Sequence, residues 1–119
     1  MALSPNALRF VIIGGGPAGT QAATVAARLG AEVTLIERDV VGGAAHLWDC
    51  IPSKAMIATG AAFGEFSEAA QMGLHAQTAQ IDLDALRGRI TGIVGRLEQS
   101  GRRLLESQGV RIIMGTGRL

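Results

Sequence analysis

Residues 9–19 read Arg-Phe-Val-Ile-Ile-Gly-Gly-Gly-Pro-Ala-Gly, and the first elements of the fold can be predicted from them. Its first five residues form a short run rich in β-branched and aromatic side chains, which predicts a buried strand. The three glycines that follow predict a tight turn. Pro17 suits the first turn of a helix, because its missing N–H has no partner to lose there. The stretch therefore predicts a strand, a glycine turn and a helix, in that order.

The residues that follow complete a βαβ unit. An alanine-rich helix is expected from Pro17 to Gly30, which supplies a C-terminal stop. Residues Glu32–Glu37 place apolar side chains at alternating positions, as in a second strand. A helix that connects two strands in this way makes them parallel, so Phe10–Glu37 predicts an α/β fold with a parallel sheet.

Two further helices and a third strand are expected downstream. One helix begins near Pro52 and runs toward Gly73. Another follows Asp82, whose side chain can cap it, and its apolar positions continue from Leu83 to Leu105. Residues Val110–Met114 have the pattern of a strand. Three internal glycines of the second helix lie on one side, where they would let another backbone approach closely: Gly88, Gly92 and Gly95.

Composition argues against several classes of function. A length of 119 residues allows one domain at most, and a net charge of +1 provides no electrostatic footprint for nucleic acid or an anionic membrane. The apolar run Leu8–Ile13 is too short to span a bilayer, and Met1–Arg9 lacks the features of a signal peptide. We therefore expect a cytoplasmic protein with no membrane span and no nucleic-acid partner, and we assign no metal-ligating residue.

The glycine turn matches G-x-G-x-x-G, a pattern that binds dinucleotides when it joins a strand to a helix. Its glycines permit the sharp turn, the approach of a pyrophosphate to bare backbone and the packing of the helix on the sheet; they are Gly14, Gly16 and Gly19. Glu37 ends the next strand and can accept both hydroxyls of an adenosine ribose. This unit does not by itself separate FAD from NAD. A glycine turn needed only for packing, and an Arg38 that pairs with a 2′-phosphate, are the other interpretations.

A second stretch, residues 41–54, reads Val-Gly-Gly-Ala-Ala-His-Leu-Trp-Asp-Cys-Ile-Pro-Ser-Lys. It resembles the redox-active segment of the flavoprotein disulfide reductases, in which Gly-Gly-Thr-Cys, four further residues and Cys-Ile-Pro-Ser-Lys follow one another. The resemblance implies FAD as cofactor and NAD(P)H as co-substrate. It also implies that Gly42 and Gly43 lie under the phosphate and ribitol region of the flavin, that Lys54 contacts the flavin near N5, and that Gly117 contacts the adenosine side.

The resemblance covers nearly the whole chain but only the opening part of the FAD domain of that family. We therefore expect residues 1–119 to be the N-terminal part of a Rossmann-like FAD-binding domain, incomplete by itself. The family's NAD(P)-binding and dimerisation domains would lie beyond it. The full-length protein is expected to be a homodimer.

One of the two cysteines of the redox-active segment is missing here. Ala45 stands where the family has the sulfur that exchanges with substrate, and Cys50, at the place of the flavin-proximal sulfur, is the single Cys of the chain. A disulfide needs two sulfurs, so this chain cannot run the dithiol chemistry of the family. Cys50 is the candidate catalytic residue, and an inert buried thiol is the other interpretation. His46 and Trp48 either face a substrate cleft or pack in place of the lost disulfide.

The chain thus looks like the cysteine-deficient, quinone-reducing branch of the disulfide reductases. The resemblance implies that hydride passes from NAD(P)H through FAD to a small-molecule acceptor such as a quinone. Two alternatives stay open: a peroxide or disulfide reductase that cycles the single thiol of Cys50, and a nucleotide-binding module without turnover.

Overall fold

The computed structural model describes residues 8–74 and 79–119, so His75 and most of Met1–Arg9 lie outside it. The described elements follow one another as β1 (Arg9–Ile13), α1 (Pro17–Arg28), β2 (Glu32–Glu37), η1 (Ala45–Cys50), α2 (Ile51–Glu68), η2 (Ala69–Met72), α3 (Leu83–Ser107) and β3 (Arg111–Met114). The segment η1 is π-helical and η2 is a short 3-10 helix.

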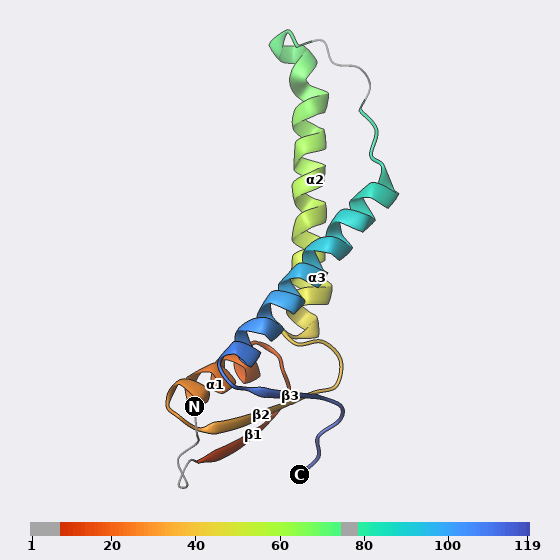
Figure 1. Cartoon of the computed structure of the whole chain (residues 1–119). Coiled ribbons are helices and arrows are strands. Elements are labelled where there is room, and N and C mark those ends of the chain that lie inside the picture. The colour runs from red at the N-terminus through yellow and green to blue at the C-terminus, as the bar shows by residue number, and fades with distance from the viewer. Residues whose placement is uncertain (1–7, 75–78) are drawn as a thin grey trace.

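The three strands form one parallel sheet in the order β1-β2-β3 (Figure 1). In its register Ile12 lies opposite Leu35, and Leu35 lies opposite Ile112. The helix between β1 and β2 and the helix before β3 provide the long connections that parallel strands require. The expected βαβ unit and the third strand are therefore confirmed.

One face of this sheet holds the core. Val33 and Leu35 lie two residues apart on β2, so both side chains point to the same face, and both are buried. Ala23 of α1 and Leu105 of α3 cover them there. The whole buried cluster is Ala23, Val33, Leu35, Val41, Leu105 and Val110. Helices α1 and α3 therefore hold the strands in place through apolar contact.

The opposite face of the sheet is open in this chain. Val11 and Ile13 alternate with the core-facing residues of β1, and the Val11 side chain is 66% exposed. On β3 the Ile113 side chain, which lies on the same open face, is exposed as well. An apolar sheet face of this kind normally packs against a further layer.

Helices α2 and α3 make a hairpin that projects from the sheet and gives the chain an extent of 72 × 26 × 18 Å (Figure 1). The Asp82 carboxylate caps α3 as expected, since its Oδ1 accepts the N–H groups of Asp84 at 3.0 Å and Ala85 at 2.9 Å. Across the described parts of the chain, no helix combines the length and the apolar character needed to cross a membrane.

The expectation of a close backbone contact at the α3 glycines is wrong for the described part of the chain. A Cβ added at Gly88 or Gly95 would meet no atom within 4 Å. At Gly92 it would meet only the Arg96 side chain of the same helix, at 3.5 Å. The side of α3 that these glycines share is therefore open, and they weaken the helix without a packing gain within this chain.

The helix that contains Pro52 begins earlier than expected, because η1 continues directly into α2. Backbone angles from Ala44 through Ile51 are already helical, and the N–H of Ile51 donates to the carbonyl of His46, five residues back. Pro52 has no N–H to donate to a carbonyl in the preceding turn. A π-helical turn before the proline therefore lets one continuous helical run contain it.

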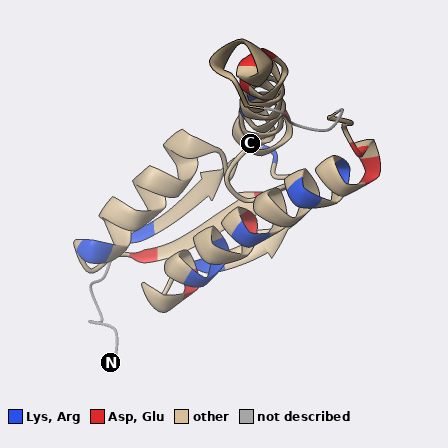
Figure 2. Cartoon of the chain, turned by 90° about the horizontal axis from the view of Figure 1, so that it is seen from above, with Lys and Arg blue, Asp and Glu red and all other residues tan. Residues whose placement is uncertain are grey.

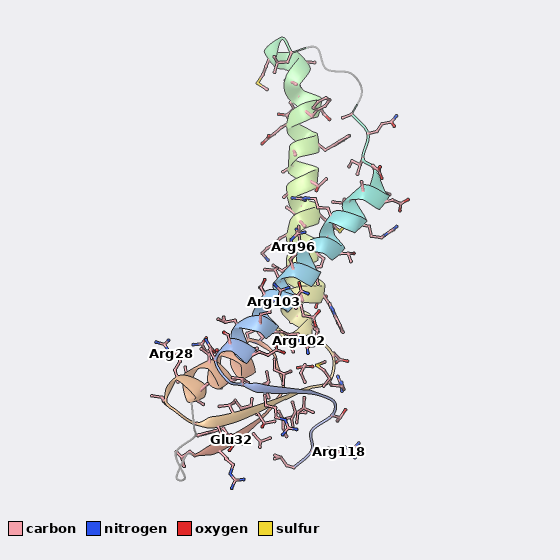
Figure 3. The ribbon with its side chains drawn as sticks, viewed as in Figure 1. Arg28, Glu32, Arg96, Arg102, Arg103 and Arg118 are labelled. Atoms are coloured by element: carbon pink, nitrogen blue, oxygen red, sulfur yellow. The ribbon has the colours of Figure 1, made fainter. Side chains whose placement is uncertain are left out.

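Charged side chains of both signs are interspersed along α3, whereas α1 carries only Arg28, in its last turn (Figure 2). Arg96, Arg102 and Arg103 extend from the half of α3 nearer to the sheet (Figure 3). The ion pairs among the described residues join immediate or near neighbours, Arg38 to Asp39 and Arg87 to Asp84, and both are exposed. Exposed pairs contribute little, so the fold depends on its apolar core.

Candidate functional site

The turn between β1 and α1 has the shape that its glycines predict. Gly14 has a φ of +101°, a conformation that L side chains rarely adopt, and its N–H donates to the carbonyl of Ile36 at 2.8 Å. A Cβ on Gly19 would overlap the carbonyl oxygen of Gly14. The first and third motif glycines are thus required by backbone conformation and by close packing.

The N-terminus of α1 begins after Gly16, and no side chain of the described residues caps it. Pro17 occupies the start of the helix, where a missing N–H costs nothing. The following N–H groups lack an intrahelical partner and carry the positive end of the helix dipole. This end of α1 is suited to an anion such as a phosphate.

The Glu37 carboxylate reaches the glycine turn from the end of β2. Its Oε2 accepts the N–H of Gly15 at 2.6 Å, and its Oε1 accepts the N–H of Asp39 at 2.7 Å. The backbone carbonyl of Glu37 accepts the N–H of Gly115 at 2.7 Å. Each carboxylate oxygen retains a second lone pair for a ligand hydroxyl. Glu37 therefore joins three segments that the sequence separates widely.

A hollow of about 230 Å³ opens at the carboxyl ends of the strands. Glu37 lines it from the end of β2 and Arg38 from the residue after it, and Gly115 and Gly117 line it from the segment after β3. A Cβ on Gly117 would come within 2.9 Å of the Ile13 side chain, so this glycine packs directly against β1. Arg38 pairs with Asp39 at 3.1 Å at the rim. Ligands of open α/β sheets bind at this end of the strands.

The loop with Gly42 and Gly43 lies against the glycine turn. The N–H of Gly42 donates to the carbonyl of Gly15 at 2.7 Å. A Cβ on Gly43 would stand 3.0 Å from the Gly16 Cα and 3.0 Å from the Pro17 Cδ. Both loop glycines also have positive φ, +114° and +91°. The result is a surface of bare backbone beside the start of α1.

Cys50 and Lys54 lie further along the same chain segment, where η1 passes into α2. Both are exposed, and their spacing of four residues places them on one side of the helix. They do not line the hollow at the strand ends. Cys50 is therefore not buried among the described residues, and its reactivity stays a prediction.

His46 and Trp48 also belong to η1, and both are exposed, Trp48 by 55%. Neither belongs to the buried core of the described residues, and their packing in place of the lost disulfide stays a prediction. Leu47, between them, is the buried residue of η1. Consecutive residues of a helix point in different directions. Since the Leu47 side chain points into the core, those of His46 and Trp48 point outward.

Sequence reasoning missed Gly15, which occupies a variable position of the motif. It is buried, and it binds Glu37 through its N–H and Gly42 through its carbonyl. The motif requires glycine only at positions 14 and 16 of the run 14–16. The additional glycine at position 15 was the signal in the sequence that could have indicated its role. Val40 and Val41 were missed as well, and both are buried beneath the loop.

Comparison with known proteins agrees with this geometry. The family described as pyridine nucleotide-disulphide oxidoreductase matches residues 8–119. The dihydrolipoyl dehydrogenase of Haloferax volcanii is 38% identical over 109 residues, which are 92% of this chain and 23% of that protein. The NAD(P)H dehydrogenase (quinone) of Mycobacterium tuberculosis is 40% identical over 116 residues, covering 93% of this chain and 24% of that protein.

Among solved structures, the crystal structure of LpdA from Mycobacterium tuberculosis superposes with a TM-score of 0.84 at 39% identity. The match covers 94% of this chain and 24% of LpdA. The chain therefore spans about a quarter of the length of these relatives. Since the family match extends over all described residues, the chain belongs to the pyridine nucleotide-disulphide oxidoreductase family, whose cofactors are FAD and NAD(P)H.

Proposed function

We propose that this chain binds the adenosine and pyrophosphate end of FAD as the N-terminal part of an FAD-binding domain. The observation that carries the proposal is the meeting of the Glu37 carboxylate, the uncapped start of α1 and the bare backbone of Gly16 and Gly43. A carboxylate suits ribose hydroxyls, and free N–H groups suit phosphates. Side chains on either glycine would fill the space between the two loops, so the residues present fit a dinucleotide.

In the whole protein we propose oxidation of NAD(P)H and reduction of a small-molecule acceptor such as a quinone. When bound, FAD supplies the group that accepts and gives up the hydride. The residues of this chain bind and orient: Gly14, Gly16 and Gly19 shape the phosphate turn, Glu37 and Gly117 border the adenosine side, and Gly42 and Gly43 support the flavin side. Lys54 supplies a cation on the helix side that also carries Cys50.

The absence of a disulfide partner supports the quinone. Ala45 and Cys50 begin and end η1, and a methyl group at Ala45 cannot bridge to sulfur. The relative that is 40% identical is named for a quinone. As further parts of the same proposal, the full-length protein is a homodimer located in the cytoplasm.

Steady-state assays of the full-length protein test this function. Oxidation of NADH and NADPH would be followed with quinone, peroxide and disulfide acceptors. We expect turnover with a quinone and none with a disulfide. Anaerobic titration with dithionite should consume two electrons per FAD, because no disulfide stores a second pair. Uptake of four electrons, or NAD in place of flavin in the purified protein, would contradict the proposal.

A second candidate function is favoured by the exposure of Cys50, since a reactive thiol must be accessible. In that case Cys50 cycles through an oxidised sulfur and reduces a peroxide or a disulfide. Turnover with peroxide that disappears when Cys50 is replaced would favour this alternative. A protein that binds FAD but turns over none of the acceptors would be a binding module.

A further inference from the structure

Gly15 connects the two sides of the candidate site through its own peptide groups. Its N–H donates to Glu37 Oε2 at 2.6 Å, and its carbonyl accepts the N–H of Gly42 at 2.7 Å. The residue is buried, so breaking either hydrogen bond would leave a buried polar group without a partner, which costs free energy. Two hydrogen bonds, joined by the backbone of Gly15, thus link the carboxylate at the end of β2 to the Gly42 loop.

The reason for a glycine here is space. Its φ is not in the positive range, so the backbone conformation does not demand glycine. A Cβ on Gly15, however, would stand 3.1 Å from both the Cβ and the Oε2 of Glu37. The missing side chain is what allows the carboxylate to reach the backbone N–H.

Gly42 is placed by the same chain of contacts. Its φ of +114° and the approach of Leu47 Cδ1 to within 3.0 Å of a Cβ there leave the loop few other conformations. A Cβ on the adjacent Gly43 would stand 3.0 Å from the Gly16 Cα and 3.0 Å from the Pro17 Cδ. Displacing the Gly15 carbonyl would therefore move the loop that leads to η1 and Cys50.

We infer that Gly15 is a positioning residue that couples the Glu37 carboxylate to the Gly42–Gly43 loop, so that the adenosine and flavin sides of the site are set together. The hydrogen-bond chain is independent of the ligand, and its use for FAD rests on the function proposed above. A charge-assisted hydrogen bond to a carboxylate is stronger than one between neutral groups. Glu37 therefore holds the glycine turn in place before a ligand binds. The two hydrogen bonds belong to neighbouring peptide groups joined by the Gly15 Cα, so the coupling passes through the backbone position of Gly15.

The test compares Gly15→Ala, Glu37→Ala and the control Gly64→Ala in the full-length protein. Gly64 lies in α2, where an added Cβ meets no atom within 4 Å. Hydrogen exchange of the segment 40–47 is measured without FAD. Loss of one hydrogen bond should speed hydrogen exchange of this segment about tenfold in both Gly15→Ala and Glu37→Ala. The effect of Glu37→Ala would be transmitted, because Glu37 lies outside the segment. Gly64→Ala should leave it unchanged.

FAD provides the second readout. Gly15→Ala should lower FAD affinity about tenfold and reduce discrimination against an FAD analogue with a 2′-deoxyadenosine ribose, because the carboxylate is displaced. Glu37→Ala should also shift the visible absorption of the bound flavin, although it changes the opposite end of the cofactor. If Gly15→Ala does not fold, Glu37→Ala still provides both measurements.

Unchanged exchange of the segment 40–47 in Glu37→Ala would overturn the coupling, as would an affinity loss with no shift of the flavin absorption. A wild-type protein that binds no FAD would instead refute the proposed function. The exchange measurement would still decide the coupling in that case, because it requires no cofactor.

Discussion

At the scale of single residues, the glycines of the turn divide into those that the fold needs and those that a ligand needs. Gly19 belongs to the first kind, since a Cβ there would overlap the Gly14 carbonyl. Gly16 belongs to the second, because its extended backbone suits any residue and the nearest atom to an added Cβ is 4.0 Å away. The motif predicts the same division of roles between these two glycines.

Replacing each of these glycines by alanine should therefore give different results. Gly19→Ala is expected to lose about 3 kcal/mol of unfolding free energy through overpacking. Gly16→Ala is expected to change it by less than about 1 kcal/mol, while weakening FAD binding through the methyl group in the path of the pyrophosphate. Denaturant titration and FAD titration of the full-length variants measure the two effects. Equal losses of stability would contradict the division.

A second residue-scale prediction concerns Cys50. If electrons pass from flavin to quinone directly, Cys50→Ser should retain most NAD(P)H-dependent quinone reduction and alter chiefly the flavin absorbance. Serine keeps the size of the side chain and removes the reactive sulfur. Steady-state kinetics with a quinone check this, with Ser53→Ala as a control because its exposed hydroxyl donates to the Cys50 carbonyl, at 3.2 Å. Loss of most turnover in Cys50→Ser alone would favour the thiol-cycling route.

At the scale of elements, α3 depends on its cap. The Asp82 side chain satisfies two N–H groups of the first turn, which offsets part of the cost of four internal glycines. In a synthetic peptide of residues 79–108, Asp82→Ala should destabilise the helix by about 1 kcal/mol and lower its helix content. Asp84→Ala should cost less, since its pair with Arg87 is almost fully exposed. Circular dichroism decides, and equal losses would contradict the capping role.

The element bounds also indicate what periodicity can predict. Strands β1 and β2 match the expected ranges, and β3 begins one residue later than expected. Strands β1 and β3 are β-branched runs closed by glycine, and β2 places apolar side chains at alternating positions. The π-helical η1 had no such signal. Its hydrogen bonding between residues five apart depends on the burial of Leu47 and on Pro52, which follows.

At the scale of the whole molecule, the open sheet face predicts the behaviour of the isolated chain. Val11, Ile13 and Ile113 expose apolar surface, and the relatives are about four times longer. Residues 1–119 alone should bind a hydrophobic dye such as ANS more strongly, per mole of chain, than the full-length protein, and should hold FAD far more weakly. Fluorescence and FAD titration of both proteins test this. Tight stoichiometric FAD binding by residues 1–119 would contradict the expectation of an incomplete domain.

The sequence alone determined the order of elements, the parallel sheet, the glycine turn, the capping Asp82 and the family, because each depends on residues close together in the chain. Local steric rules and hydrogen-bonding groups act within one or two turns, and a reader of the sequence can apply them directly. The folded chain was needed to show that Gly15 links Glu37 to Gly42, that Cys50 and Trp48 are exposed among the described residues, and that the α3 glycines face open space there. Those facts depend on how segments 20 or more residues apart pack, which no local pattern encodes.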